Sequence, residues 1–81
     1  MRYSIRMRTI LVTGATGTVG SAVITALIDG ATPVRILAGV RAGEEARIAC
    51  GAYPNGSVLE TVRFDFADRA TVDAAVAQSD V

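Results

Sequence analysis

The sequence predicts an α/β fold with three layers, in which a parallel sheet carries helices on both faces. Three apolar runs rich in β-branched residues, at positions 9–13, 34–40 and 58–64, are typical of buried strands. A segment with helical character follows each run. Because parallel strands are joined by right-handed crossovers, this βαβαβα order predicts the strand order 3-2-1, counted along the chain.

Each predicted helix has its own boundary signal. The first ends at Asp29, with Gly30 as its stop. The second, at residues 44–50, is short because Gly51 and the turn residues after it break the pattern. The third is capped by Asp68. The apolar faces are expected at positions 19, 22, 23, 26 and 27 of the first helix and at 72, 75 and 76 of the third.

The length and composition of the chain limit the class of protein to which it can belong. With 81 residues, of which 51% are hydrophobic, the chain holds one small globular domain. We assign residues 1–8 to a disordered N-terminal extension and residues 9–81 to the domain. Eight basic and eight acidic residues give no net charge, so no field draws the chain to nucleic acid or membrane. The apolar stretch 22–28 is far shorter than the roughly 18 residues of a membrane span, and we expect a soluble, cytoplasmic protein.

The residue types that are missing exclude several chemistries. All eight basic residues are arginines, so Schiff-base chemistry and a Tyr/Lys pair are excluded within this chain. There is no histidine, which excludes a histidine triad and a histidine metal site. Cys50 is the single cysteine and lacks the partners of a zinc site. We therefore expect no metal site and no catalytic residue here.

A glycine loop between the first strand and the first helix is the clearest chemical signal. Gly14 allows the tight turn, Gly17 lets backbone amides approach a ligand, and Gly20 lets the helix pack closely on the sheet. Thr16 and Thr18 add hydroxyl donors. This placement predicts a pyrophosphate cradle of the Rossmann type, although a glycine-rich turn without a ligand gives the same pattern.

The end of the second strand bears on the choice of dinucleotide. About 20 residues after the glycine loop, NAD-binding folds carry an acidic residue, whereas an arginine suits the 2′-phosphate of NADP. Arg41 holds this place, and the next carboxylate is Glu44, which with Glu45 is assigned to the surface. The sequence thus favours NADP over NAD, unless Arg41 is an ordinary solvated arginine. Arg35 lies at the opposite end of the strand.

Asp65 and Phe66 follow the third strand, at the edge of the same crevice. Ligands of open α/β sheets bind outside the carboxyl ends of the strands. Asp65 is therefore placed to accept a hydrogen bond from an adenine amino group. The alternative is a loop carboxylate near the third helix.

Three segments, ILVTGATGTVGSAV, PVRILAGVR and VRFDFADRATVDAAV, together resemble the N-terminal half of NmrA-like proteins, within the atypical short-chain dehydrogenase/reductase superfamily. The resemblance covers about Thr9 to Val81. It implies a partial NAD(P)-binding Rossmann domain from an NAD(P)-dependent oxidoreductase family, with Arg41 at the 2′-phosphate and Asp65 and Phe66 beside the adenine. The residues implied at the pyrophosphate are Gly14, Thr16, Gly17, Thr18 and Val19.

The sequence also departs from that family. Members continue through further strands that carry the nicotinamide pocket, the substrate site and, in catalytic members, a YxxxK motif; Tyr3 and Tyr53 match no such motif. We therefore expect a truncated, cofactor-binding portion without catalysis. A non-enzymatic module that senses NADP(H) or binds a partner, and an inactive fragment, are the alternatives. With the first strand at an edge, we also expect self-association or a complementing chain.

Overall fold

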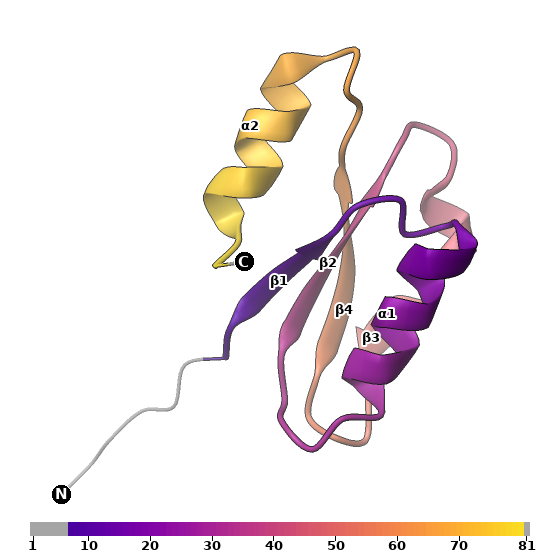
Figure 1. Cartoon of the computed structure of the whole chain (residues 1–81), viewed down its shortest axis with the longest axis vertical. Helices are drawn as coiled ribbons and strands as arrows, with labels where there is room; N and C mark the ends of the chain where they lie inside the picture. Colours follow the sequence, from indigo (N-terminus) through magenta and orange to yellow (C-terminus); the bar gives the residue numbers. More distant parts are fainter. Residues whose placement is uncertain (1–6, 81) are drawn as a thin grey trace, which may run out of the picture.

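The computed structural model describes residues 7–80, in which a four-stranded sheet lies between two helices (Figure 1). Of the predicted disordered extension 1–8, residues 1–6 lie outside the described range. The elements are β1 (Thr9–Val12), α1 (Thr18–Ile28), β2 (Arg35–Val40), a 3-10 turn (Glu45–Arg47), β3 (Gly51–Ala52), β4 (Val58–Arg63) and α2 (Arg69–Gln78).

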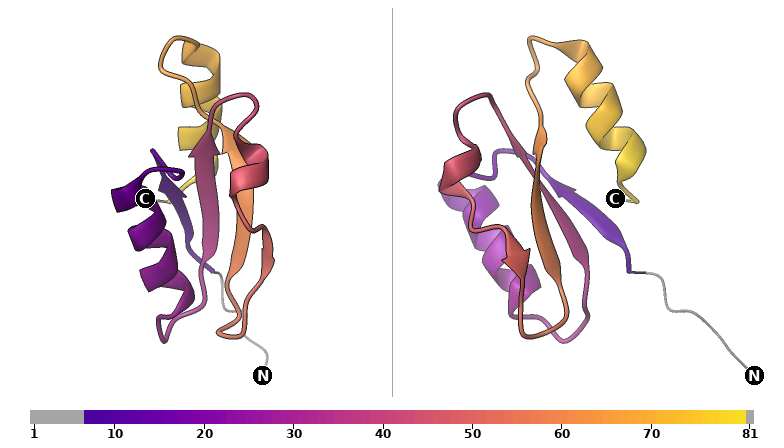
Figure 2. Two further views of the ribbon diagram at one scale, coloured as in Figure 1. Left: turned by 90° about the vertical axis from the view of Figure 1, so that its right-hand side faces the viewer. Right: turned by 180° about the vertical axis from the view of Figure 1, so that it is seen from behind.

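The sheet has the order β1-β2-β4-β3. Strands β1, β2 and β4 are parallel, and they are the three predicted strands in their predicted order. The short strand β3 was not predicted and pairs antiparallel with the outer side of β4. Helices α1 and α2 cover opposite faces of the sheet (Figures 1 and 2), so the predicted α/β class with three layers is confirmed.

The main core lies between α1 and the sheet. Alternate residues of β2 point to one face, and Ile36, Ala38 and Val40 are all buried there against Ile24 of α1. Leu37, which is also buried, points to the opposite face, where α2 contacts β1 and β4. Burial on both faces explains why β2 is an almost uninterrupted apolar run.

The predicted apolar face of α1 is correct only at Leu27, because the helix is rotated relative to the prediction. The structure buries Gly20 and Ile24 and half-buries Leu27 and Ile28, whereas Val19 is 77% exposed. The reason lies at the first turn, where Gly20 packs against the backbone of the glycine loop. That contact turns the residues that follow Gly20 at helical spacing toward the sheet.

The predicted second helix, residues 44–50, is reduced to the 3-10 turn Glu45–Arg47. The chain is extended again at Ile48, and Gly51 has φ +145°, a conformation that suits only glycine. Pairing of β3 with β4 takes the place of further helical turns. This segment therefore continues the sheet instead of covering it.

Helix α2 ties the end of the described chain to the edge of the sheet. As predicted, Asp68 caps the helix, and its side chain accepts a hydrogen bond from Ala70 N. At the other end, Asp80 N donates to Thr9 O at 2.7 Å, and the Asp80 carboxylate accepts from Thr9 N at 2.8 Å. These bonds occupy the first position of the outer edge of β1. Self-association along the rest of this edge stays a prediction.

Neither of the helices in residues 7–80 is long and apolar enough to cross a membrane.

Candidate functional site

The glycine loop makes a tight turn from β1 into α1. Gly14 has φ +62°, and Gly17 N donates to Gly14 O at 3.0 Å. Helix α1 begins after Gly17, and no side chain among residues 7–80 caps it. The N–H groups of its first turn are therefore free to donate to a ligand, in the electrostatic field that favours anions at a helix N-terminus.

The backbone around this turn is open at Gly14 but leaves no room for a side chain at Gly20. A Cβ at Gly20 would lie 2.1 Å from Gly14 O, so the helix and the loop are in direct backbone contact. On the outer side of the turn, a Cβ at Gly14 would meet nothing within 4 Å. Free amides beside open space are what a bound pyrophosphate requires, and the loop fits that group.

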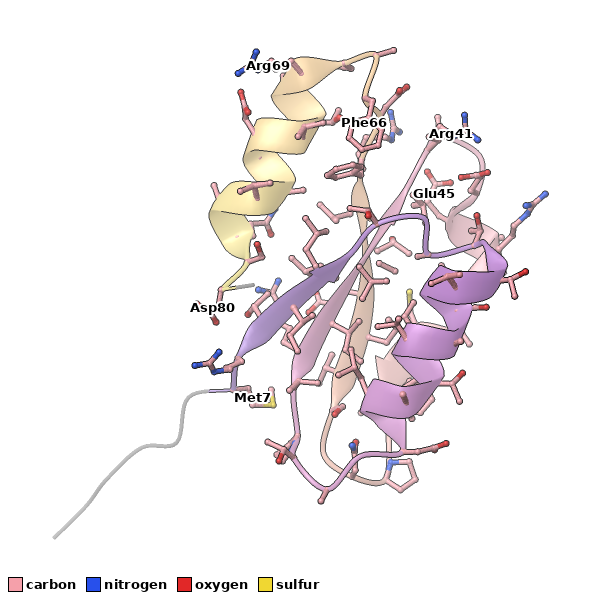
Figure 3. All side chains as sticks on the ribbon, viewed as in Figure 1. Met7, Arg41, Glu45, Phe66, Arg69 and Asp80 are labelled. Atoms are coloured by element: carbon pink, nitrogen blue, oxygen red, sulfur yellow. The ribbon has the colours of Figure 1, made fainter. Side chains whose placement is uncertain are left out.

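A crevice of about 280 Å³ opens at the carboxyl ends of the parallel strands. Five of the nine predicted site residues line it: Gly14, Thr16, Arg41, Asp65 and Phe66. Figure 3 shows Arg41 and Phe66 at the same end of the molecule, above β2 and β4. Parallel pairing explains this convergence, because it puts the carboxyl ends of all three strands on one edge of the sheet.

The other four predicted residues line a second hollow, of about 570 Å³, beside the outer edge of β1. These are Gly17, Thr18, Val19 and Gly20, and Val23 continues the wall along α1. Gly14 lines both hollows. The glycine loop thus stands between two cavities, an arrangement that suits an elongated ligand with its phosphates in the middle.

Arg41 lies on the rim of the crevice, with 70% of its side chain exposed. Its Nη2 is 3.8 Å from Glu44 Oε2, and its backbone N donates to Glu44 Oε1 at 3.2 Å. The structure therefore brings Glu44 into the site, although the sequence assigned it to the surface. The available signal was Gly43, whose φ of +87° turns the chain back toward Arg41.

Asp65 and Phe66 line the crevice from the loop between β4 and α2. Asp65 Oδ1 accepts from Ala67 N at 2.9 Å, so the carboxylate also shapes its own loop. Phe66 is 82% exposed and packs at 87° against the ring of Phe64, with 5.0 Å between the ring centres. This edge-to-face contact holds an apolar surface at the mouth of the crevice.

Besides Glu44, the sequence analysis missed two residues that line the crevice, Gly39 and Phe64. A Cβ at Gly39 would lie 3.0 Å from Phe64 Cβ, so glycine is needed for the ring to reach its place. A glycine inside a strand is itself a signal of such a close approach.

A comparison with protein families identifies the family of this chain. The model of the NAD dependent epimerase/dehydratase family matches residues 10–81. The chain belongs to this family. Its members bind NAD(P), which agrees with the predicted N-terminal portion of a Rossmann domain. No curated protein and no solved structure matches the chain.

Proposed function

We propose that this member of the epimerase/dehydratase family binds NADP(H) in preference to NAD(H), as the cofactor-binding portion of an oxidoreductase of the NmrA-like type in the cytoplasm. One observation carries the preference for NADP. Arg41 follows β2 and lines the same crevice as Gly14 of the glycine loop. An arginine there can donate two hydrogen bonds to a 2′-phosphate.

The remaining assignments follow from the two hollows. The first-turn amides of α1 bind the pyrophosphate, and Thr16 adds a hydroxyl donor. The adenine lies in the crevice beside Phe66, where Asp65 accepts from its amino group. The nicotinamide half extends into the hollow along β1. When bound, the dinucleotide supplies a ring that carries hydride, and the chain contributes binding and orientation.

We assign no catalytic step to this chain. Its sequence contains neither lysine nor histidine. The hydroxyl of Tyr53 donates to Ala49 O, and Tyr53 lines a different hollow, on the α1 face of the sheet, together with Ile24 and Leu59. Binding of the dinucleotide without a catalysed reaction is also what the alternative function, the sensing of NADP(H), would require.

The test is a titration of the protein with NADPH and, separately, with NADH, followed by nucleotide fluorescence and by melting temperature. A ligand that binds only the folded state raises the melting temperature. We expect tighter binding of NADPH. Arg41→Ala should weaken NADPH binding about tenfold, equivalent to about 1.4 kcal/mol, a value below that of a buried ion pair because Arg41 is exposed. Binding of NADH should change by less than about twofold.

Arg47→Ala is the matched control, because Arg47 is exposed and lines the hollow on the α1 face rather than the crevice. It should leave both affinities unchanged. If folded protein binds neither nucleotide, the proposed function is wrong. If Arg41→Ala weakens the binding of NADPH and the binding of NADH equally, Arg41 does not contact the 2′-phosphate.

A further inference from the structure

Two carboxylates follow Arg41, and the structure separates their roles. The side chain of Glu44 lines the crevice and is only 23% exposed. Glu45 accepts from Gly43 N at 3.0 Å and lies 3.9 Å from Arg63, and it does not line the crevice. Only Glu44 therefore meets a ligand that reaches Arg41.

Glu44 is held in place by the backbone of the residue that it faces. Glu44 N donates to Arg41 O at 3.1 Å, and Arg41 N donates to Glu44 Oε1 at 3.2 Å. This reciprocal pair closes the turn after β2 and holds the carboxylate close to the Arg41 side chain. The second oxygen, Oε2, is 3.8 Å from Arg41 Nη2, a distance at which the charges attract without a direct hydrogen bond.

A carboxylate at this place acts in opposite directions on the two nucleotides. Toward NADPH it repels the 2′-phosphate and competes with it for Arg41. Toward NADH it offers an acceptor to the hydroxyls of an unphosphorylated ribose, the interaction by which acidic residues recognise NAD. Arg41 alone would make the site strongly selective for NADPH, and Glu44 opposes that selectivity.

We infer that Glu44 is a second determinant of cofactor selectivity, whose negative charge reduces the preference for NADPH that Arg41 sets. This inference rests on the proposed dinucleotide binding. It concerns the ratio of the two affinities, which is measured on the same protein without any reaction.

The experiment measures the dissociation constants of NADPH and NADH for the wild-type chain and three variants. Glu44→Gln removes the charge and keeps an acceptor for Arg41 N. We expect this variant to bind NADPH more tightly and NADH more weakly than the wild type. The ratio of the two dissociation constants should shift in favour of NADPH by about tenfold. Glu44→Ala should shift the ratio in the same direction and serves if the glutamine variant does not fold. Glu45→Gln changes the net charge equally, one residue away, and should leave the ratio within about twofold.

Each outcome has one meaning. If the wild-type chain binds neither nucleotide, the proposed function and the inference both fail. If it binds them and a folded Glu44 variant leaves the ratio unchanged, or shifts it no more than Glu45→Gln does, the inference alone is overturned and the proposed function stands.

Discussion

Replacing Gly20 with alanine tests the backbone contact on which the cradle depends. The new Cβ would lie 2.1 Å from Gly14 O and 2.7 Å from Gly14 C, against at least 3.4 Å for ordinary contact. Both atoms belong to the backbone, so the loop or the helix must move by about 1.3 Å at the closest contact. Overpacking costs about 1–3 kcal/mol, and a clash with backbone belongs at the upper end of that range.

Alanine also gains helix propensity, about 1 kcal/mol relative to glycine, which offsets part of the clash. The net expectation is a loss of about 2 kcal/mol, or about 10 °C in melting temperature for a domain of this size. Circular dichroism during a thermal melt measures it. Ser21→Ala, at the next and exposed position, should change the melting temperature by no more than about 3 °C. If Gly20→Ala melts at or above the wild type, the close contact does not exist as described.

Two further substitutions test contacts away from the site. The Arg35 guanidinium donates to Glu60 Oε2 at 2.9 Å and so lowers the pKa of the Glu60 carboxyl; Glu60→Gln should cost about 0.5 kcal/mol in urea unfolding at neutral pH, because both side chains are partly exposed. A lowered pKa stabilises the fold at pH values above the ordinary pKa of the carboxyl, and this stabilisation is lost as the pH falls through the lowered value. The difference should therefore shrink in acid and vanish once Glu60 is protonated in the folded state, and an equal difference at neutral and acidic pH would contradict the ion pair. Ser57 is fully buried and its Oγ accepts from Val34 N at 3.0 Å, so Ser57→Ala should cost about 1–3 kcal/mol by leaving that N–H unpaired. An unchanged thermal melt would show that the N–H finds another partner.

Local patterns were enough to predict the parallel sheet and the edge of it at which several candidate site residues converge. The three apolar runs lie where β1, β2 and β4 are observed, because a strand buried on both faces must be apolar throughout. Arg41 and Asp65 could be assigned to one crevice because parallel strands end on the same edge. The glycine spacing placed the proposed phosphate cradle at the first of these ends.

The features that were missed depend on contacts between segments. The rotation of α1 is set by the close approach of Gly20 to Gly14. The spacing of apolar residues within the helix contains no information about that contact. The segment after Glu44 has moderate helical character, but its pairing with β4 as β3 outweighs local propensity. Glu44 itself looked like a surface residue because only the closed turn shows that its side chain points back to Arg41.

The same geometry links binding to folding in this small domain. The crevice and the hollow beside β1 are lined by residues from the ends of β1, β2 and β4 and from the start of α1, so no single element forms the site. A dinucleotide that spans both hollows would contact all of these elements at once, including β1, which pairs within residues 7–80 with a strand on one side only. Binding then stabilises the edge of the sheet as well as filling the cradle, because a ligand shifts the equilibrium toward the state in which its contacts are assembled. The selectivity that we propose for Arg41 and Glu44 would act through the same equilibrium, since a nucleotide that binds more tightly at the end of β2 also stabilises the fold more.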